Sequence, residues 1–127
     1  YNEVRDFKSG LAAVSKNARW GFIDLTTELS IPLIYDEVSD FSEDMACVRI
    51  GRRWGVINED GKQIVLFDYD NIFPFDQGLA IVVKNGKWGM INKKGLEAVA
   101  LEYDEIFPFR SGVATVEQNG KFGAKST

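Results

Sequence analysis

The chain repeats one sequence unit at an interval of 34 residues. Tyrosine recurs at this interval, and so does an aromatic residue followed by glycine. These positions are Tyr1, Tyr35, Tyr69 and Tyr103, and Trp20-Gly21, Trp54-Gly55, Trp88-Gly89 and Phe122-Gly123. A fixed period is typical of repeat architectures, in which each unit buries its apolar face against its neighbours. We therefore treat residues 1–127 as one array of four repeats, 1–34, 35–68, 69–102 and 103–127.

The third repeat shows the strand pattern most clearly. Asn85-Gly86 stands between two runs rich in β-branched residues, and this dipeptide suits a type I′ turn, which needs positive φ at both central residues. Such a turn places Val82 opposite Gly89, on a face with small side chains. A small, flat face predicts close approach by a neighbouring sheet. The corresponding turns at Asn17-Ala18 and Gly51-Arg52 lack the glycine at their second position, so we expect their type to differ.

A second turn and a third extended run complete the unit. The runs cover residues 31–38, 64–72 and 99–106, and no apolar period of 3.6 residues competes with a β reading. Pro32, Pro74 and Pro108 are expected at strand ends or in connections, because proline has no N–H to donate. The sequence predicts an all-β fold in which each repeat is a three-stranded antiparallel meander and the four stack as an open, twisted array. A small closed, propeller-like ring is the alternative.

Several motifs recur in phase and point to a known family. They are Asn85-Gly86-Lys87-Trp88-Gly89, its echo Arg53-Trp54-Gly55, Tyr-Asp-Glu-Val and Gly-Leu-Ala-x-Val. Through them the chain resembles the bacterial WG-repeat family, also called KWG repeats, over essentially its whole length. The resemblance implies an all-β tandem module that often lies beside other domains, and it brings no catalytic residues. The departures from the pattern are Phe122 for tryptophan, Ala18 and Arg52 for the turn glycine, and Asp44-Met45 for Gly-Leu.

The composition excludes several kinds of chemistry. The chain has no histidine, so histidine-based triads, histidine metal sites and the commonest general base are ruled out. Its 15 basic and 19 acidic residues give a net charge of −4 without a basic stripe, which argues against nucleic-acid binding. No apolar run approaches the roughly 20 residues that cross a bilayer. We expect no enzyme activity, no cofactor or metal and no membrane insertion, and the sequence does not indicate a compartment.

Two columns of the repeat have structural interpretations. Cys47 is the only cysteine, and it occupies a place held by alanine, isoleucine or threonine in the other repeats, so we expect it to be a small buried hydrophobe. Asp36, Asp70 and Asp104 each lie near the end of an extended run, where a carboxylate can accept backbone N–H bonds and shape a turn. A ladder of calcium ions between these carboxylates is the alternative.

Candidate binding residues come from positions at which one repeat departs from the others. Four such positions are apolar where sister repeats are polar: Ile50, Phe73, Val83 and Phe107. An exposed patch of this kind marks an interaction site. Alternatively, the third and fourth repeats pack differently from the first two.

The tryptophans Trp20, Trp54 and Trp88 allow a second binding hypothesis. Exposed indoles stack on sugar faces, whereas buried indoles anchor packing between units, and their recurrence favours packing. Three functions therefore stay open. The preferred one is a non-catalytic module that binds a protein partner. The others are glycan or cell-wall binding through the tryptophans, and a structural spacer within a longer protein.

Overall fold

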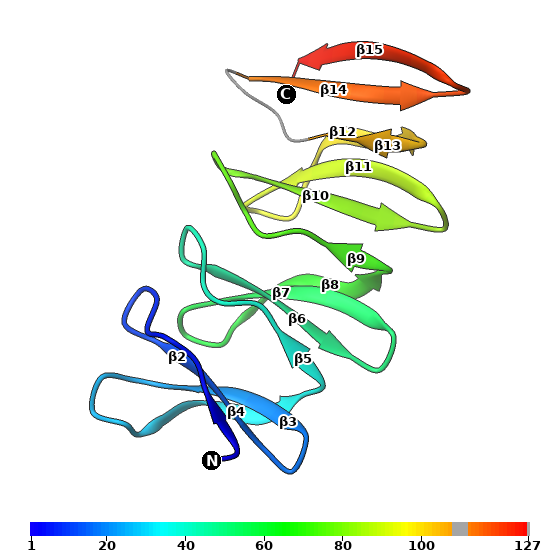
Figure 1. Ribbon diagram of the computed structural model, residues 1–127. Helices are drawn as coiled ribbons and strands as arrows, with labels where there is room; N and C mark the ends of the chain where they lie inside the picture. Colours follow the sequence, from blue (N-terminus) through cyan, green and yellow to red (C-terminus); the bar gives the residue numbers. More distant parts are fainter. Residues whose placement is uncertain (108–111, 127) are drawn as a thin grey trace.

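The computed structural model describes residues 1–107 and 112–126, and all regular elements in them are β-strands (Figure 1). The first sheet holds β1 (Glu3–Val4), β2 (Ala12–Lys16), β3 (Arg19–Ile23) and β4 (Leu29–Tyr35). The second holds β5 (Glu37–Val38), β6 (Met45–Ile50), β7 (Arg53–Asn58) and β8 (Gln63–Tyr69). The third holds β9 (Asn71–Ile72), β10 (Leu79–Lys84), β11 (Lys87–Asn92) and β12 (Glu97–Tyr103). The fourth holds β13 (Glu105–Ile106), β14 (Val113–Gln118) and β15 (Lys121–Ser126).

The four antiparallel sheets are stacked in chain order, with the two termini at opposite ends of the stack (Figure 1). The prediction of an open all-β array is confirmed, and the closed ring is wrong. Among the described residues no helix has the length and apolar character of a membrane span.

The predicted strand count per unit needs correction. Each third extended run bends at its aspartate, so that β4 ends at Tyr35 and β5 begins at Glu37 in the next sheet. The short strand β5 pairs with β6, placing Val38 opposite Val48. Among residues 1–107 and 112–126, the first three sheets therefore have four strands in meander order, and the fourth has three. A strand of two residues is too short to show a period in the sequence, which explains the error.

The predicted hairpin register is confirmed. Val82 pairs with Gly89 across the turn, and φ is 52° at Asn85 and 77° at Gly86, as a type I′ turn requires. The turn with Ala18 has the same type, because φ is also positive there, at 64°. That expectation of a different turn type was wrong for Ala18. It is confirmed at the second hairpin, where Gly51 has positive φ and Arg52 does not.

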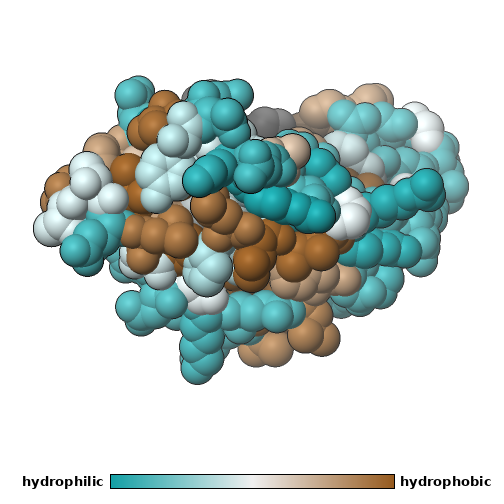
Figure 2. Space-filling model, turned by 90° about the horizontal axis from the view of Figure 1, so that it is seen from below, coloured by the Kyte–Doolittle hydropathy of each residue, from teal (hydrophilic) through white to brown (hydrophobic). Residues whose placement is uncertain are grey.

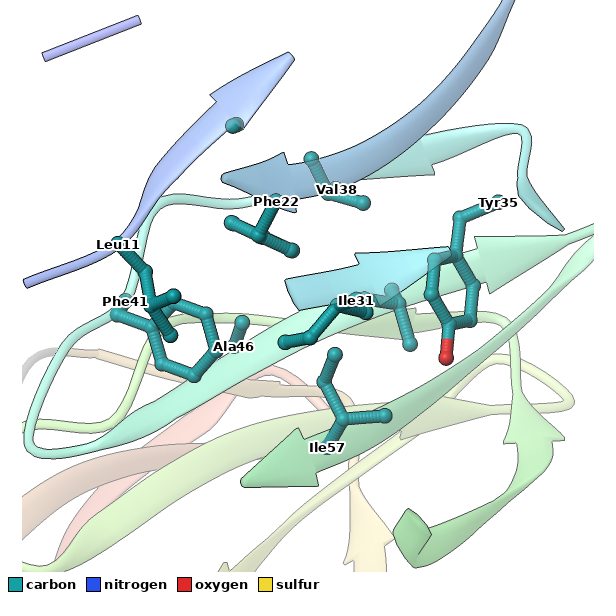
Figure 3. Packing of buried hydrophobic residues seen from close by; sticks show 10 residues of the cluster. Leu11, Phe22, Ile31, Tyr35, Val38, Phe41, Ala46 and Ile57 are labelled. Atoms are coloured by element: carbon teal, nitrogen blue, oxygen red, sulfur yellow. The ribbon is translucent and has the colours of Figure 1, made fainter. Parts of the chain in front are cut away.

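Three of the four hydrophobic clusters in the described part of the chain lie between sheets, and a small fourth one lies within the first sheet. Phe22, Ile31 and Tyr35 of the first sheet are buried against residues of the second sheet, including Ile57 (Figure 3). Phe22 is fully buried and meets Phe41 edge to face, with ring centroids 4.8 Å apart. The same packing recurs between the second and third sheets and between the third and fourth. Each unit thus depends on its neighbours for burial, as expected of a repeat array.

The outer face of the first sheet has no preceding sheet packed on it in the described chain, and it exposes side chains that are buried in later units. Val4 is 57% exposed and Phe7 is 41% exposed, whereas the equivalent Val38 and Phe41 are buried between sheets. Figure 2 views this end of the stack and shows hydrophobic side chains gathered among hydrophilic ones. Two of the side chains that join units inside the array are therefore exposed at its first face.

Glycine is required after each tryptophan for a different reason from the one predicted. A Cβ on Gly89 would lie 2.7 Å from the carbonyl oxygen of Val99, which belongs to the adjacent strand β12. The register of β11 and β12 shifts at this place, so β12 curls over the glycine. The close approach is therefore within the sheet and not from a neighbouring sheet.

The prolines follow the prediction in part. Pro74 lies in the connection after β9, but Pro32 lies inside β4, which corrects the expectation of a strand end. The edge position of β4 in its sheet explains why proline is tolerated there. Pro108 lies outside the described residues, as does Phe109.

Cys47 lies buried between the second and third sheets, as predicted, with its Sγ 3.7 Å from the carbonyl oxygen of Phe73. Burial raises the pKa of this thiol to about 12. Because the thiolate is the reactive form, we expect Cys47 in the native protein to resist a disulfide reagent at pH 8 that labels the denatured chain completely. Absorbance of the released thiol measures the reaction, and rapid labelling of the native protein would contradict this burial.

Candidate functional site

A cavity of about 330 Å³ lies at the junction of the third and fourth sheets. Residues from β10, β11 and β13 line it together with the segments that follow β9 and β13. Its wall includes Phe73, Asp76, Ile81, Trp88, Glu105 and Phe107. The cavity is thus mainly apolar and aromatic, with two carboxylate side chains.

Short strands position the two phenylalanines. Phe73 directly follows β9, and its N–H donates to the carbonyl oxygen of Ile81 at 2.9 Å. Phe107 follows β13 in the same way, and its N–H donates to the carbonyl oxygen of Thr115 at 2.9 Å. Because both N–H groups extend the pairing of their strands, the two side chains leave the backbone at equivalent places in consecutive units.

Aromatic contacts hold the cavity wall. The ring of Phe73 stacks on the indole of Trp88, with centroids 5.6 Å apart and planes at 29°. Phe107 packs on Phe122, with centroids 6.0 Å apart. Aromatic pairs of this kind contribute stabilisation beyond that of the area they bury.

At the junction of the first and second sheets, a side chain of the protein itself occupies the place that corresponds to this cavity. Arg5 occupies the repeat position of Phe73, and its guanidinium lies 4.2 Å from the ring centroid of Trp20, a cation–π contact. Its Nη1 donates to the carbonyl oxygen of Val38 at 2.8 Å and lies 3.8 Å from a carboxylate oxygen of Asp40. The indole of Trp20 therefore receives a cation and that of Trp88 another aromatic ring.

The structure brings some of the sequence candidates together and separates others. Phe73 and Phe107, which the patch hypothesis selected, line one cavity with Trp88, which the glycan hypothesis selected. Val83 pairs with Trp88 next to the cavity. Ile50 lies elsewhere, at the turn end of β6 in the second sheet, and is 43% exposed.

The tryptophans are half-buried and packed against the cores between sheets. Trp20 packs on the first core, Trp54 on the second and Trp88 on the third. Arg5 covers one face of Trp20, and Phe73 covers one face of Trp88. These contacts support the interpretation of the indoles as anchors between units.

The aspartate column shapes turns, as its structural interpretation predicted, and it also joins units. Asp36 accepts a hydrogen bond from the backbone N–H of Gly51 at 2.6 Å and also pairs with Arg19 of the preceding sheet. The Gly51 bond and, after it, the Arg19 charge lower the pKa of this carboxyl. Asp104 has a lowered pKa for the same reasons, since it accepts the N–H of Asn119 at 2.8 Å and pairs with Lys87. Among the described residues no group of three or more potential ligands could hold a metal ion.

Sequence reasoning missed several polar contacts. Glu43 accepts the backbone N–H groups of Gln77 and Gly78, at 2.6 and 2.7 Å, and so links the second unit to the third. Asp76 and Glu105 were not identified as cavity residues, because surface carboxylates are common in this chain. A signal existed for Asp76, since the equivalent residue of the first repeat is Lys8 and the charge is inverted.

Stacked meanders with cores between the sheets define this chain as a tandem β-repeat protein. Its sequence matches the family described as "WG containing repeat" over residues 1–20, 20–53, 54–88 and 88–122. The chain therefore belongs to the WG-repeat family, which confirms the resemblance.

A solved structure with a similar fold is described as the crystal structure of the computationally designed Ika4 protein. It is 12% identical to this chain, with a TM-score of 0.56, over 97% of this chain and 88% of that one. At this identity the likeness concerns the fold alone. Comparison with curated proteins gave no match.

Proposed function

We propose that this WG-repeat array is a non-catalytic binding module and that a protein partner docks at the cavity between the third and fourth sheets. One observation carries the proposal: the rings of Phe73, Trp88 and Phe107 line a single concave site. Binding pockets are typically concave and mostly apolar, with a few polar groups, and aromatic side chains dominate the energetics of protein interfaces. Phe73 and Phe107 are apolar at positions where the first two repeats carry Arg5 and Ser39, so this junction differs from the packing rule of the array.

The alternatives draw less support. Stacking on a sugar needs an open aromatic face, and the packing of Trp20 and Trp88 leaves each with one face already occupied. A pure spacer does not account for a cavity lined by aromatic rings at one junction.

A peptide library displayed on phage tests the proposal. The library is selected on the wild-type protein after depletion on the double variant Phe73→Ser, Phe107→Ser. We expect selected peptides to bind the wild type about 30-fold or more tightly than the double variant, because loss of a hot-spot residue costs about 2 kcal/mol or more. Fluorescence polarisation with synthetic peptides measures the ratio.

Leu66→Ser is the matched control. Leu66 is 74% exposed on β8 and does not line this cavity, so its replacement removes apolar surface elsewhere. We expect this variant to bind like the wild type, and thermal unfolding checks that every variant is folded. Failure to select any peptide, or equal binding to the folded double variant, would overturn the proposal.

A further inference from the structure

The geometry points to an arginine side chain of the partner as the group that enters the cavity between the third and fourth sheets. This inference rests on the proposed function and names the chemistry of its ligand. The guanidinium would lie against the aromatic wall formed by Phe73, Trp88 and Phe107, with its charge opposite the carboxylates of Asp76 and Glu105.

The protein itself contains the precedent. At the first junction the guanidinium of Arg5 stacks over Trp20 at 4.2 Å and donates a 2.8 Å hydrogen bond to the carbonyl oxygen of Val38. Trp88 and Ile106 are the repeat equivalents of Trp20 and Val38, and both line the cavity at the last junction. At the last junction the ring of Phe73 takes the place of Arg5 on the indole, so a guanidinium from the partner would enter beside this aromatic pair.

The charges at the first and last junctions differ in a way that favours a cationic ligand at the last one. The first repeat supplies Arg5 and Lys8, whereas the third repeat has Phe73 and Asp76 at the same positions. Glu105 keeps the negative charge of its equivalent, Glu37. Among the described residues that line the cavity there is no lysine or arginine, whereas Asp76 and Glu105 both carry a carboxylate. A ligand that brings a positive charge would supply the cation that Arg5 supplies at the first junction, where it lies 3.8 Å from Asp40.

The size and shape of the cavity favour a single planar cation. Its volume of about 330 Å³ is at the lower end of the roughly 300–1,000 Å³ usual for ligand pockets, which suits one side chain better than a large ligand. Guanidinium is planar and weakly hydrated, stacks on aromatic rings and bonds carboxylates through two N–H groups. An ammonium group is more strongly hydrated and lacks the planar face.

Four acetylated, amidated peptides test the inference, identical except for one central arginine, citrulline, lysine or leucine. Citrulline keeps the size and planarity of arginine without its charge. Isothermal calorimetry at low salt measures their affinities for the wild-type protein. We expect the arginine peptide to bind about tenfold more tightly than the citrulline peptide, and more tightly than the lysine and leucine peptides.

Single charge-removing variants provide the second arm. Glu105→Gln and Asp76→Asn are expected to lower the affinity for the arginine peptide about fivefold each while leaving the citrulline peptide unchanged. Glu37→Gln is the matched control, because it removes the same charge at the equivalent position of another junction. We expect it to leave the arginine affinity unchanged.

The outcomes separate the two proposals. Equal affinity for arginine and citrulline, a preference for lysine or leucine, or no binding of any of the four peptides overturns the guanidinium assignment. In each of these cases the docking proposal stands if library peptides still depend on Phe73 and Phe107. If no library peptide depends on those residues, the docking proposal fails, whatever the arginine series shows.

Discussion

Replacing Gly89 with alanine is expected to lower the free energy of unfolding by about 3 kcal/mol, a large part of the roughly 5–15 kcal/mol that stabilises a typical domain. The added Cβ would lie 2.7 Å from the carbonyl oxygen of Val99 and 3.1 Å from the carbonyl carbon of Ala100. Both are backbone atoms, so no rotation of a side chain relieves the overlap. Relief requires β12 to move away from β11, which weakens the pairing and the core beneath it. Urea denaturation followed by tryptophan fluorescence measures the effect.

Gly123→Ala is the control for that experiment. Gly123 occupies the same repeat position in the fourth sheet, where no strand follows β15 in the described chain. A Cβ at Gly123 would have no heavy atom within 4 Å beyond its own residue and its two chain neighbours. We expect a change within about 0.5 kcal/mol, as for most exposed sites. Equal destabilisation by the two substitutions would show that the curl of β12 does not explain the glycine.

Phe22→Ala is expected to cost about 3–5 kcal/mol, because it removes a fully buried ring from the core between the first and second sheets. Loss of the edge-to-face contact with Phe41 adds to the cavity that remains. Since each unit packs on its immediate neighbours, we expect the first two units to open most readily. Hydrogen exchange with mass spectrometry should show the largest loss of protection in β2–β7 and the smallest in β14 and β15.

Phe122→Ala is the matched control for Phe22→Ala, since Phe122 is 67% exposed. It loses contact with Phe107 but leaves no buried cavity, so we expect a change of about 1 kcal/mol or less. A loss of protection spread evenly over all four units after Phe22→Ala would contradict the dependence on nearest neighbours.

Local chemistry explains why much of the fold could be predicted. Asn85 and Gly86 are residue types that tolerate the positive φ values of this turn. The two-residue turn then fixes which residues of β10 and β11 lie opposite each other. The passage of the chain from the first sheet to the second at Asp36 could not be predicted in the same way. Its neighbour β5 pairs over only two residues, and its place depends on a hairpin that comes later in the chain.

The candidate site was recognised only in parts. Phe73 and Phe107 stood out because they differ from their equivalents, and Trp88 stood out because it does not. The two phenylalanines supported the hypothesis of a protein-binding patch, whereas the tryptophan supported glycan binding. Nothing in the sequence indicates that the three residues lie together. The structure places all three in one cavity with Asp76 and Glu105.

The sequence by itself determined the repeat, the β-hairpins, their register and the all-β class, because the period can be read along the chain and turn chemistry acts over a few residues. Only the tertiary structure decided which sheet each short strand joins, why glycine follows each tryptophan, and which side chains share a cavity. The physical reason is that these features arise where separate units or curled strands meet, so they depend on packing between residues that are far apart in the chain or that lie on different strands.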